Sequence, residues 1–205
     1  MKLKNIHYYS GIVLTIFIGL HLFNHAMSIF GIGTHLAVME NLRLFYRNLL
    51  VETILGLAVL TQITSGIRLV WKKRKMETSF FERLQMWSGL YLAFFLVIHV
   101  SAILVGRFIL KLDTNFYFGA AGLNHFPFNL FFIPYYGLAI LSFFGHIASI
   151  HAQKMRKTIL GFSPDQQAKM ILVKGVLLCI LIFYGLTNGF TGIELPAGYE
   201  VLIGK

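Results

Sequence analysis

Five long apolar runs constrain this chain more than any other feature of its sequence. The runs cover residues 8–30, 49–71, 86–110, 128–150 and 170–190. Each reaches the roughly 20 residues that a helix needs to cross the hydrocarbon core of a bilayer. Because the runs are continuously apolar rather than alternating, they predict membrane-spanning helices and not barrel strands. We therefore expect an all-α integral membrane protein with five transmembrane helices, in which residues 1–205 form a single membrane domain.

The composition supports this class and excludes several others. Hydrophobic residues make up 57% of the chain and charged residues only 13%, which is unlike a soluble globular protein. The single cysteine, Cys179, excludes covalent c-type haem attachment and cysteine-ligated iron–sulfur clusters. The short connections leave no room for a flavin or nucleotide domain, and so apolar a chain is not expected to bind nucleic acid. Any chemistry must lie among the helices or come from another subunit.

Basic residues predict how the chain lies in the membrane. One side would carry most of them, namely Lys2, Lys4, Lys72, Lys73, Arg74, Lys75, Arg83, Lys154, Arg156, Lys157 and Lys169. The other side would carry only Arg43, Arg47, Arg107 and Lys111. The positive-inside rule then places the N-terminus in the cytoplasm and the C-terminus outside, in the inner (cytoplasmic) membrane of a cell. The net charge of +10 also suits contact with anionic membrane lipid or an acidic soluble partner.

The clearest local pattern is an internal echo between the first and third runs. His21 follows Tyr9-Ser10-Gly11 ten residues after the glycine, and His99 follows Trp87-Ser88-Gly89 at the same offset. Both runs begin on the predicted cytoplasmic side, so a rise of about 1.5 Å per residue places each histidine about 15 Å beyond its glycine. We expect His21 and His99 to lie at one depth on parallel helices.

Two imidazoles at one depth suit a bis-histidine haem. Haem iron takes one imidazole nitrogen on each face of the porphyrin, and small residues let the helices and the ring approach closely. The alternative is that each histidine only hydrogen-bonds to a neighbouring helix. The matching lead-in residues favour haem ligation by His21 and His99.

A weaker set of polar residues lies toward the predicted cytoplasmic side. His146 is well along the fourth run, and at comparable depth the second run offers Gln62 rather than a histidine. His151 and His7 lie at the adjacent ends of the fourth and first runs. These residues would form a second haem site, a quinone pocket or no site at all.

Taken together, these features resemble the cytochrome b membrane subunit of the succinate dehydrogenase and fumarate reductase family, the succinate:quinone oxidoreductases, in its single-polypeptide, five-helix form. The resemblance covers nearly the whole chain. Its motifs are short: His7-x-x-Ser10-Gly11 with His21, Leu84-Gln85-x-x-Ser88-Gly89 with His99, and His146 in the fourth run.

The resemblance implies two b haems stacked across the membrane, with one histidine ligand from each of the first four helices. His21 and His99 match the ligands of the outer haem, and His146 matches one ligand of the inner haem. Gln62, four residues ahead of the glycine in Thr64-Ser65-Gly66, occupies the second inner position. A neutral amide is a poor iron ligand, so we expect one haem b and leave the second open. Met86 also departs from the family, which has an arginine there.

The resemblance further implies electron transfer between a respiratory dehydrogenase or reductase and membrane quinone, which would be the substrate. The partners would be soluble flavoprotein and iron–sulfur subunits on the cytoplasmic face. Candidate quinone contacts are His25, Ser10 and His7. Less favoured candidates in the outer connections are His35, Glu40, Glu52, Asp113 and His125. Arginines 43, 47, 68 and 107 are candidate partners of haem propionates, although interfacial anchoring also explains them.

Three other functions stay open from the residues alone. The chain would be a stand-alone one-haem redox protein, a haem-free bundle that handles protons or a metal ion, or a haem-free anchor for a soluble complex. Whether the chain itself is quinone-reactive or is a non-catalytic subunit of an oxidoreductase is also left open.

Overall fold

The architecture, seen in a computed structural model, is described for residues 3–73 and 79–205. The protein is 82% helical. Its long helices are α1 (Leu3–Ala26), α3 (Leu49–Lys73), α4 (Phe80–Leu104), α6 (Asn129–Lys154) and α7 (Pro164–Leu186). The shorter elements are η1 (Met27–Phe30), α2 (Ile32–Tyr46), the π-helical turn η2 (Val105–Ile109), α5 (Phe116–Asn124) and η3 (Ala197–Ile203).

The prediction of five membrane-spanning helices is confirmed by length and composition. The apolar helical segments are Leu3–Phe30, Leu49–Lys72, Phe80–Ile109, Asn129–Lys154 and Pro164–Leu186. Large apolar side chains are exposed along them, such as Ile16, Leu57 and Leu177, which are about as exposed as surface residues of a soluble protein. In a membrane these side chains contact lipid tails, so the fold is that of a multi-pass membrane protein.

Three long helices, α1, α4 and α7, begin earlier than their apolar runs, and capping residues start the last two. Ser79 and Glu82 form a reciprocal capping box at the start of α4. Ser163 and Gln166 do the same for α7, where Pro164 occupies the first turn. Both motifs satisfy backbone N–H groups that would otherwise lack partners. Hydropathy does not detect these polar first turns, which is why the predicted starts at residues 86 and 170 are late.

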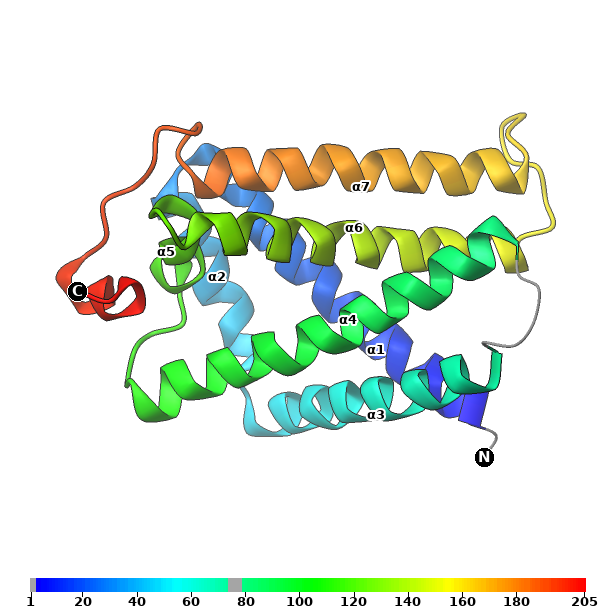
Figure 1. Cartoon of the computed structure of the whole chain (residues 1–205), viewed down its shortest axis with the longest axis horizontal. Helices are drawn as coiled ribbons and strands as arrows, with labels where there is room; N and C mark the ends of the chain where they lie inside the picture. Colours follow the sequence, from blue (N-terminus) through cyan, green and yellow to red (C-terminus); the bar gives the residue numbers. More distant parts are fainter. Residues whose placement is uncertain (1–2, 74–78) are drawn as a thin grey trace.

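The five long helices run roughly lengthwise through the molecule, with α1 and α4 inclined to α3, α6 and α7 (Figure 1). The chain termini lie at opposite ends of this bundle (Figure 1). We call the end that carries α2, α5 and η3 the α2–α5 end, and the opposite end the N-terminal end. The most extensive packing is between α4 and α6, between α6 and α7, and between α1 and α3.

The hydrophobic core is displaced toward the α2–α5 end. Its buried residues come from α1, α5, α6 and α7 and include Phe116, Phe143 and Ile182. The most apolar windows of α1, α6 and α7 are each 28% buried, whereas those of α3 and α4 are only 11% and 6% buried. The side of the bundle formed by α3 and α4 therefore keeps most of its surface free for lipid, a prosthetic group or a partner.

The helices α2 and α5 were not predicted from the apolar runs. They lie within connections 31–48 and 111–127, and each is too short to cross a bilayer. In Figure 1, α2 joins the end of α1 to the start of α3 across the α2–α5 end. The basic residues Lys2, Arg74 and Lys75, which contribute to the orientation prediction, lie outside the described residues.

Candidate functional site

Four histidines from three helices lie in contact toward the α2–α5 end. The Nε2 atoms of His21 and His25, both on α1, are 3.1 Å apart. The ring of His99 on α4 lies 6.1 Å from that of His21, centre to centre. The ring of His35 on α2 lies 5.4 Å from that of His25. We call these four residues the histidine cluster.

The spacing of His21 and His99 fits a pair of axial haem ligands. Imidazole nitrogens bind metal ions at about 2 Å, so the ring centres of two ligands on opposite faces of one iron lie about 6 Å apart. The observed separation is 6.1 Å, with the ring planes at 68°. Both rings are half-buried. For haem to bind, the His21 Nε2 would have to give up its contact with His25 and bind the iron instead.

Aromatic rings support the two imidazoles from behind. Phe17 stacks on His21 with the ring centres 5.8 Å apart, and Phe95 stacks on His99 with the ring centres 4.9 Å apart. Tyr136 meets His99 edge-on at 6.5 Å. These contacts restrict the orientation of each imidazole and make the surroundings apolar and aromatic, as a porphyrin requires.

The remaining part of the histidine cluster contains buried polar atoms without partners. His35 is only 1% exposed, and its Nε2 lies 3.3 Å from the Asn24 amide nitrogen. The Nδ1 atoms of His25 and His35 and the Oδ1 of Asn24 have no hydrogen-bond partner in the described part of the chain. Such atoms are costly to leave unsatisfied, so they indicate a site for water, a proton or a ligand.

His35 is one of several polar residues that the sequence places in the outer connections. In the structure it is buried on α2 against Phe116, with the ring centres 5.1 Å apart. Burial, together with the charges of His21 and Arg43, lowers the pKa of His35 to about 4. The spacing of four residues between His35 and Met39 is the sequence feature that could have indicated its burial, because it places both on one face of α2.

At the N-terminal end, three Ser-Gly dipeptides each receive a polar side chain from a neighbouring helix. His7 of α1 lies against Ser65-Gly66 of α3, and His146 of α6 lies against Ser88-Gly89 of α4. Gln62 of α3 lies against Ser10-Gly11 of α1. A Cβ added at each glycine would meet the incoming side chain at 3.2 or 3.3 Å. The internal echo in the sequence therefore marks close helix contacts as well as the depth of histidines.

Hydrogen bonds fix the tautomers of His7 and His146. Ser65 donates its hydroxyl proton to the Thr61 carbonyl, so it accepts from the His7 Nδ1 at 2.8 Å. The His146 Nδ1 donates to the Gln85 carbonyl at 3.1 Å. Both rings therefore carry the proton on Nδ1 and a lone pair on Nε2. Metal-ligating histidines are commonly held in this way, with the second nitrogen donating to protein.

Gln62 is committed to structure instead of being free for a ligand. Its amide donates to the His7 carbonyl and to the Ser10 hydroxyl, the latter at 2.8 Å. Ser10 in turn donates to the Ile6 carbonyl at 2.8 Å. Gln62 and Ser10 thus join α3 to α1. His151, also at this end, contacts Gln167 of α7 at 2.9 Å.

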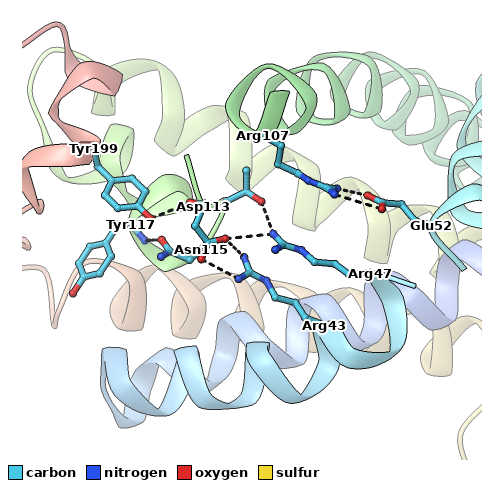
Figure 2. A network of polar contacts seen from close by, with 9 residues as sticks. Arg43, Arg47, Glu52, Arg107, Asp113, Asn115, Tyr117 and Tyr199 are labelled. Atoms are coloured by element: carbon cyan, nitrogen blue, oxygen red, sulfur yellow. Dashed lines mark hydrogen bonds and ion pairs between the residues drawn. The ribbon is translucent and has the colours of Figure 1, made fainter. Parts of the chain in front are cut away.

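The arginines and acids of the predicted outer connections mostly pair with one another. Arg43 and Arg47 both pair with the carboxylate of Asp113, with nitrogen-to-oxygen distances of 2.9 and 3.4 Å (Figure 2). Arg107 pairs with Glu52. These carboxylates are therefore not free quinone contacts, and the arginines are not free partners for propionates. Of the other candidates, His125 contacts the Ala121 carbonyl at 3.0 Å, and Glu40 is exposed.

In the described residues, no group of three or more histidine, cysteine, aspartate or glutamate side chains has a geometry that could hold a metal ion. This finding gives no support to an all-protein metal site. It does not bear on haem, whose iron needs only two protein ligands. The fold and the histidine cluster define an all-helical, multi-pass membrane protein with polar residues grouped at two depths.

Comparison with models of known protein families, with curated proteins and with solved structures found no match.

Proposed function

We propose that this chain is a b-type cytochrome that anchors a succinate dehydrogenase or fumarate reductase to the membrane and transfers electrons between that enzyme and quinone. The observation that carries the proposal is the 6.1 Å approach of the His21 and His99 rings from two different helices. The resemblance of the motifs to succinate:quinone oxidoreductases supplies the electron donor class. The low burial of α3 and α4 supports a site that is completed by a group other than the chain itself.

His21 and His99 would hold haem b, which transfers single electrons when it is bound. Phe17 and Phe95 keep the two imidazoles oriented by stacking behind them. Once His21 turns its Nε2 away from His25, the His25 ring is released as a hydrogen-bonding group next to the site. Replacement of His21 or His99 is therefore expected to reduce haem binding more than replacement of His25.

Quinone reduction and oxidation also require protons. His25, Asn24 and His35 form a polar path from His21 to the surface helix α2. A neutral imidazole accepts a proton on one nitrogen while it donates from the other, so this path would suit proton transfer. This role assigns His25 to proton delivery at the end where the haem would lie.

The N-terminal end offers a different kind of contact. The free Nε2 lone pair of His7 would accept a hydrogen bond from a quinol hydroxyl, whereas the Ser10 hydroxyl is already satisfied. His146 and Gln62 would not form a second bis-histidine haem site, because Gln62 is not a histidine and its amide is hydrogen-bonded to α1. The basic residues of this end, including Lys154, Arg156 and Lys157, would face the cytoplasm and bind the flavoprotein and iron–sulfur subunits.

A second candidate function is favoured by one observation, the direct contact of His21 with His25. Four imidazoles that contact one another in the order His99, His21, His25 and His35 would also serve a haem-free bundle that conducts protons. A stand-alone one-haem redox protein differs from the main proposal only in lacking the soluble subunits.

The test is the absorption spectrum of the purified protein before and after reduction. We expect a b-type spectrum that appears with dithionite and also with a short-chain quinol. The quinol response should weaken in His7→Leu but not in the control His151→Leu, at unchanged haem content. A purified, folded protein without a reducible haem spectrum would contradict the proposal and favour the proton-conducting bundle.

A further inference from the structure

An open cleft of about 470 Å³ lies at the α2–α5 end, apart from the histidine cluster. It is lined by Arg47, Arg107, Phe108, Lys111, Leu112 and Asp113. The apolar span of α4 and η2 ends at Ile109, so the cleft begins where the hydrocarbon region would end. Figure 2 shows arginines 43, 47 and 107 and the carboxylates of Glu52 and Asp113 converging beside the cleft from α2, α3, η2 and the following loop.

Positive charge exceeds negative charge around this cleft. Arg43 and Arg47 share the single carboxylate of Asp113, and Glu52 is used by Arg107. Lys111 has no ion-pair partner among the residues that the structure describes. Four cationic groups thus face two carboxylates, which leaves an excess positive charge that an anion would neutralise.

The backbone beside the cleft is held in two uncommon conformations. Arg107 lies in the π-helical turn η2, and Lys111 has a φ of +56°, in the left-handed region that side chains other than glycine rarely adopt. The bonds Leu110 N to Val105 O and Leu112 N to Gly106 O, both 2.9 Å, close this wide turn. Such features gather at ligand sites, because a strained backbone persists where it places functional groups.

The surroundings of the cleft indicate what kind of anion would bind. Phe108 and Ile109 are 60% and 71% exposed, and Leu49 at the start of α3 is 81% exposed. Apolar surface therefore continues from the cationic cleft toward the membrane. Arginine guanidinium groups match the geometry of phosphate oxygens, and lysine adds a point charge. A ligand with a phosphate head and acyl tails satisfies both parts of this surface.

We propose that this cleft binds the phosphate group of an anionic phospholipid. Lys111 provides a charge without an ion-pair partner among the described residues, and Arg47 shares its carboxylate with Arg43. Arg107, held by Glu52, forms the opposite wall. The site is an open cleft lined by two arginines and a lysine. It is independent of haem binding.

The experiment measures lipid retention by native mass spectrometry of the purified full chain, loaded with phosphatidylglycerol or phosphatidylcholine. We expect preferential retention of phosphatidylglycerol, reduced about tenfold in Arg47→Gln and in Lys111→Gln because each variant loses a charge-assisted hydrogen bond. Lys111→Gly removes the same charge but suits the left-handed backbone, so it separates loss of binding from misfolding. Lys157→Gln, at the N-terminal end, is the matched control and should not change retention.

Inorganic phosphate distinguishes the source of the ligand. If phosphate alone raises the thermal midpoint of the wild type but not of Lys111→Gly, while neither lipid is preferred, the cleft binds phosphate from a soluble source. Equal retention of both lipids together with no response to phosphate would overturn the proposal. A parallel loss of haem in the Lys111 variants would also overturn it, because the cleft would then serve a haem propionate.

Discussion

In the proposed function, the number of haem sites depends on Gln62. Its side chain packs against Ser10-Gly11 of α1, as the His146 side chain packs against Ser88-Gly89 of α4. We call the space beside each Ser-Gly dipeptide its notch. The sequence alone identified Gln62 as the departure from a bis-histidine pair. It did not indicate that the amide joins α3 to α1, because that depends on two donors reaching across a helix interface.

Gln62→His should therefore create a second haem site with His146. The Ser-Gly notch already accepts an imidazole at its two other occurrences, so the new ring fits without moving the backbone. We expect the haem content per polypeptide to about double, measured by pigment extraction. Gln62→Leu is the control, with no gain of haem, and an unchanged haem content in folded Gln62→His would refute this prediction.

His35 should make stability depend on pH. Its pKa is lowered from 6.5 to about 4, so the unfolded chain binds a proton between these values that the folded protein does not. Stability is therefore fully present above pH 6.5 and falls as the pH drops toward 4, by on the order of 3 kcal/mol. The groups around His35 are His21, His25 and Asn24 of α1, Phe116 of α5 and Arg43 of its own helix.

The measurement is the thermal midpoint in detergent from pH 7.5 to 4.5. His35→Gln keeps a hydrogen-bonding group beside Asn24 but cannot be protonated, so its midpoint should fall less on acidification. His151→Gln removes a histidine at the N-terminal end and should keep the wild-type profile. Identical profiles for wild type and His35→Gln would show that the pH dependence arises elsewhere.

At the scale of elements, apolar length predicted the five spans well, whereas the short helices needed tertiary structure. α2 and α5 are stabilised by packing at one end of the bundle, through contacts such as His35 with Phe116, rather than by a long apolar run. The early starts of α4 and α7 were readable in principle from Ser79-x-x-Glu82 and Ser163-Pro164.

Two glycines provide a direct test of helix packing. A Cβ on Gly175 of α7 would lie 2.5 Å from the Cβ and Cγ atoms of Phe144 on α6, whereas a Cβ on Gly19 of α1 would meet nothing within 4 Å. We expect Gly175→Ala to destabilise the protein by about 1–3 kcal/mol through overpacking. Gly19→Ala should be neutral or stabilising by up to about 1 kcal/mol, because alanine favours helices. Equal thermal midpoints for the two variants would contradict the packing described here.

For the whole molecule, the sequence predicted that His21 and His99 share one depth, and the structure brings their rings together. Depth follows from helical rise alone, so the echo of Ser-Gly motifs was sufficient. The position of His25 between His21 and His35 was not predictable, since it depends on how α2 folds back across the α2–α5 end. The pairing of Arg43 and Arg47 with Asp113 was hidden for the same reason, because the partners are far apart in the chain.

The haem content of three single variants tests the central claim most directly. If His21 and His99 clamp one iron, the wild type should contain about one haem per polypeptide, and His21→Leu and His99→Leu should contain none. His25→Leu, which alters the histidine one helical turn beyond His21, should keep the haem of the wild type. Full haem content in both His21→Leu and His99→Leu would contradict the account.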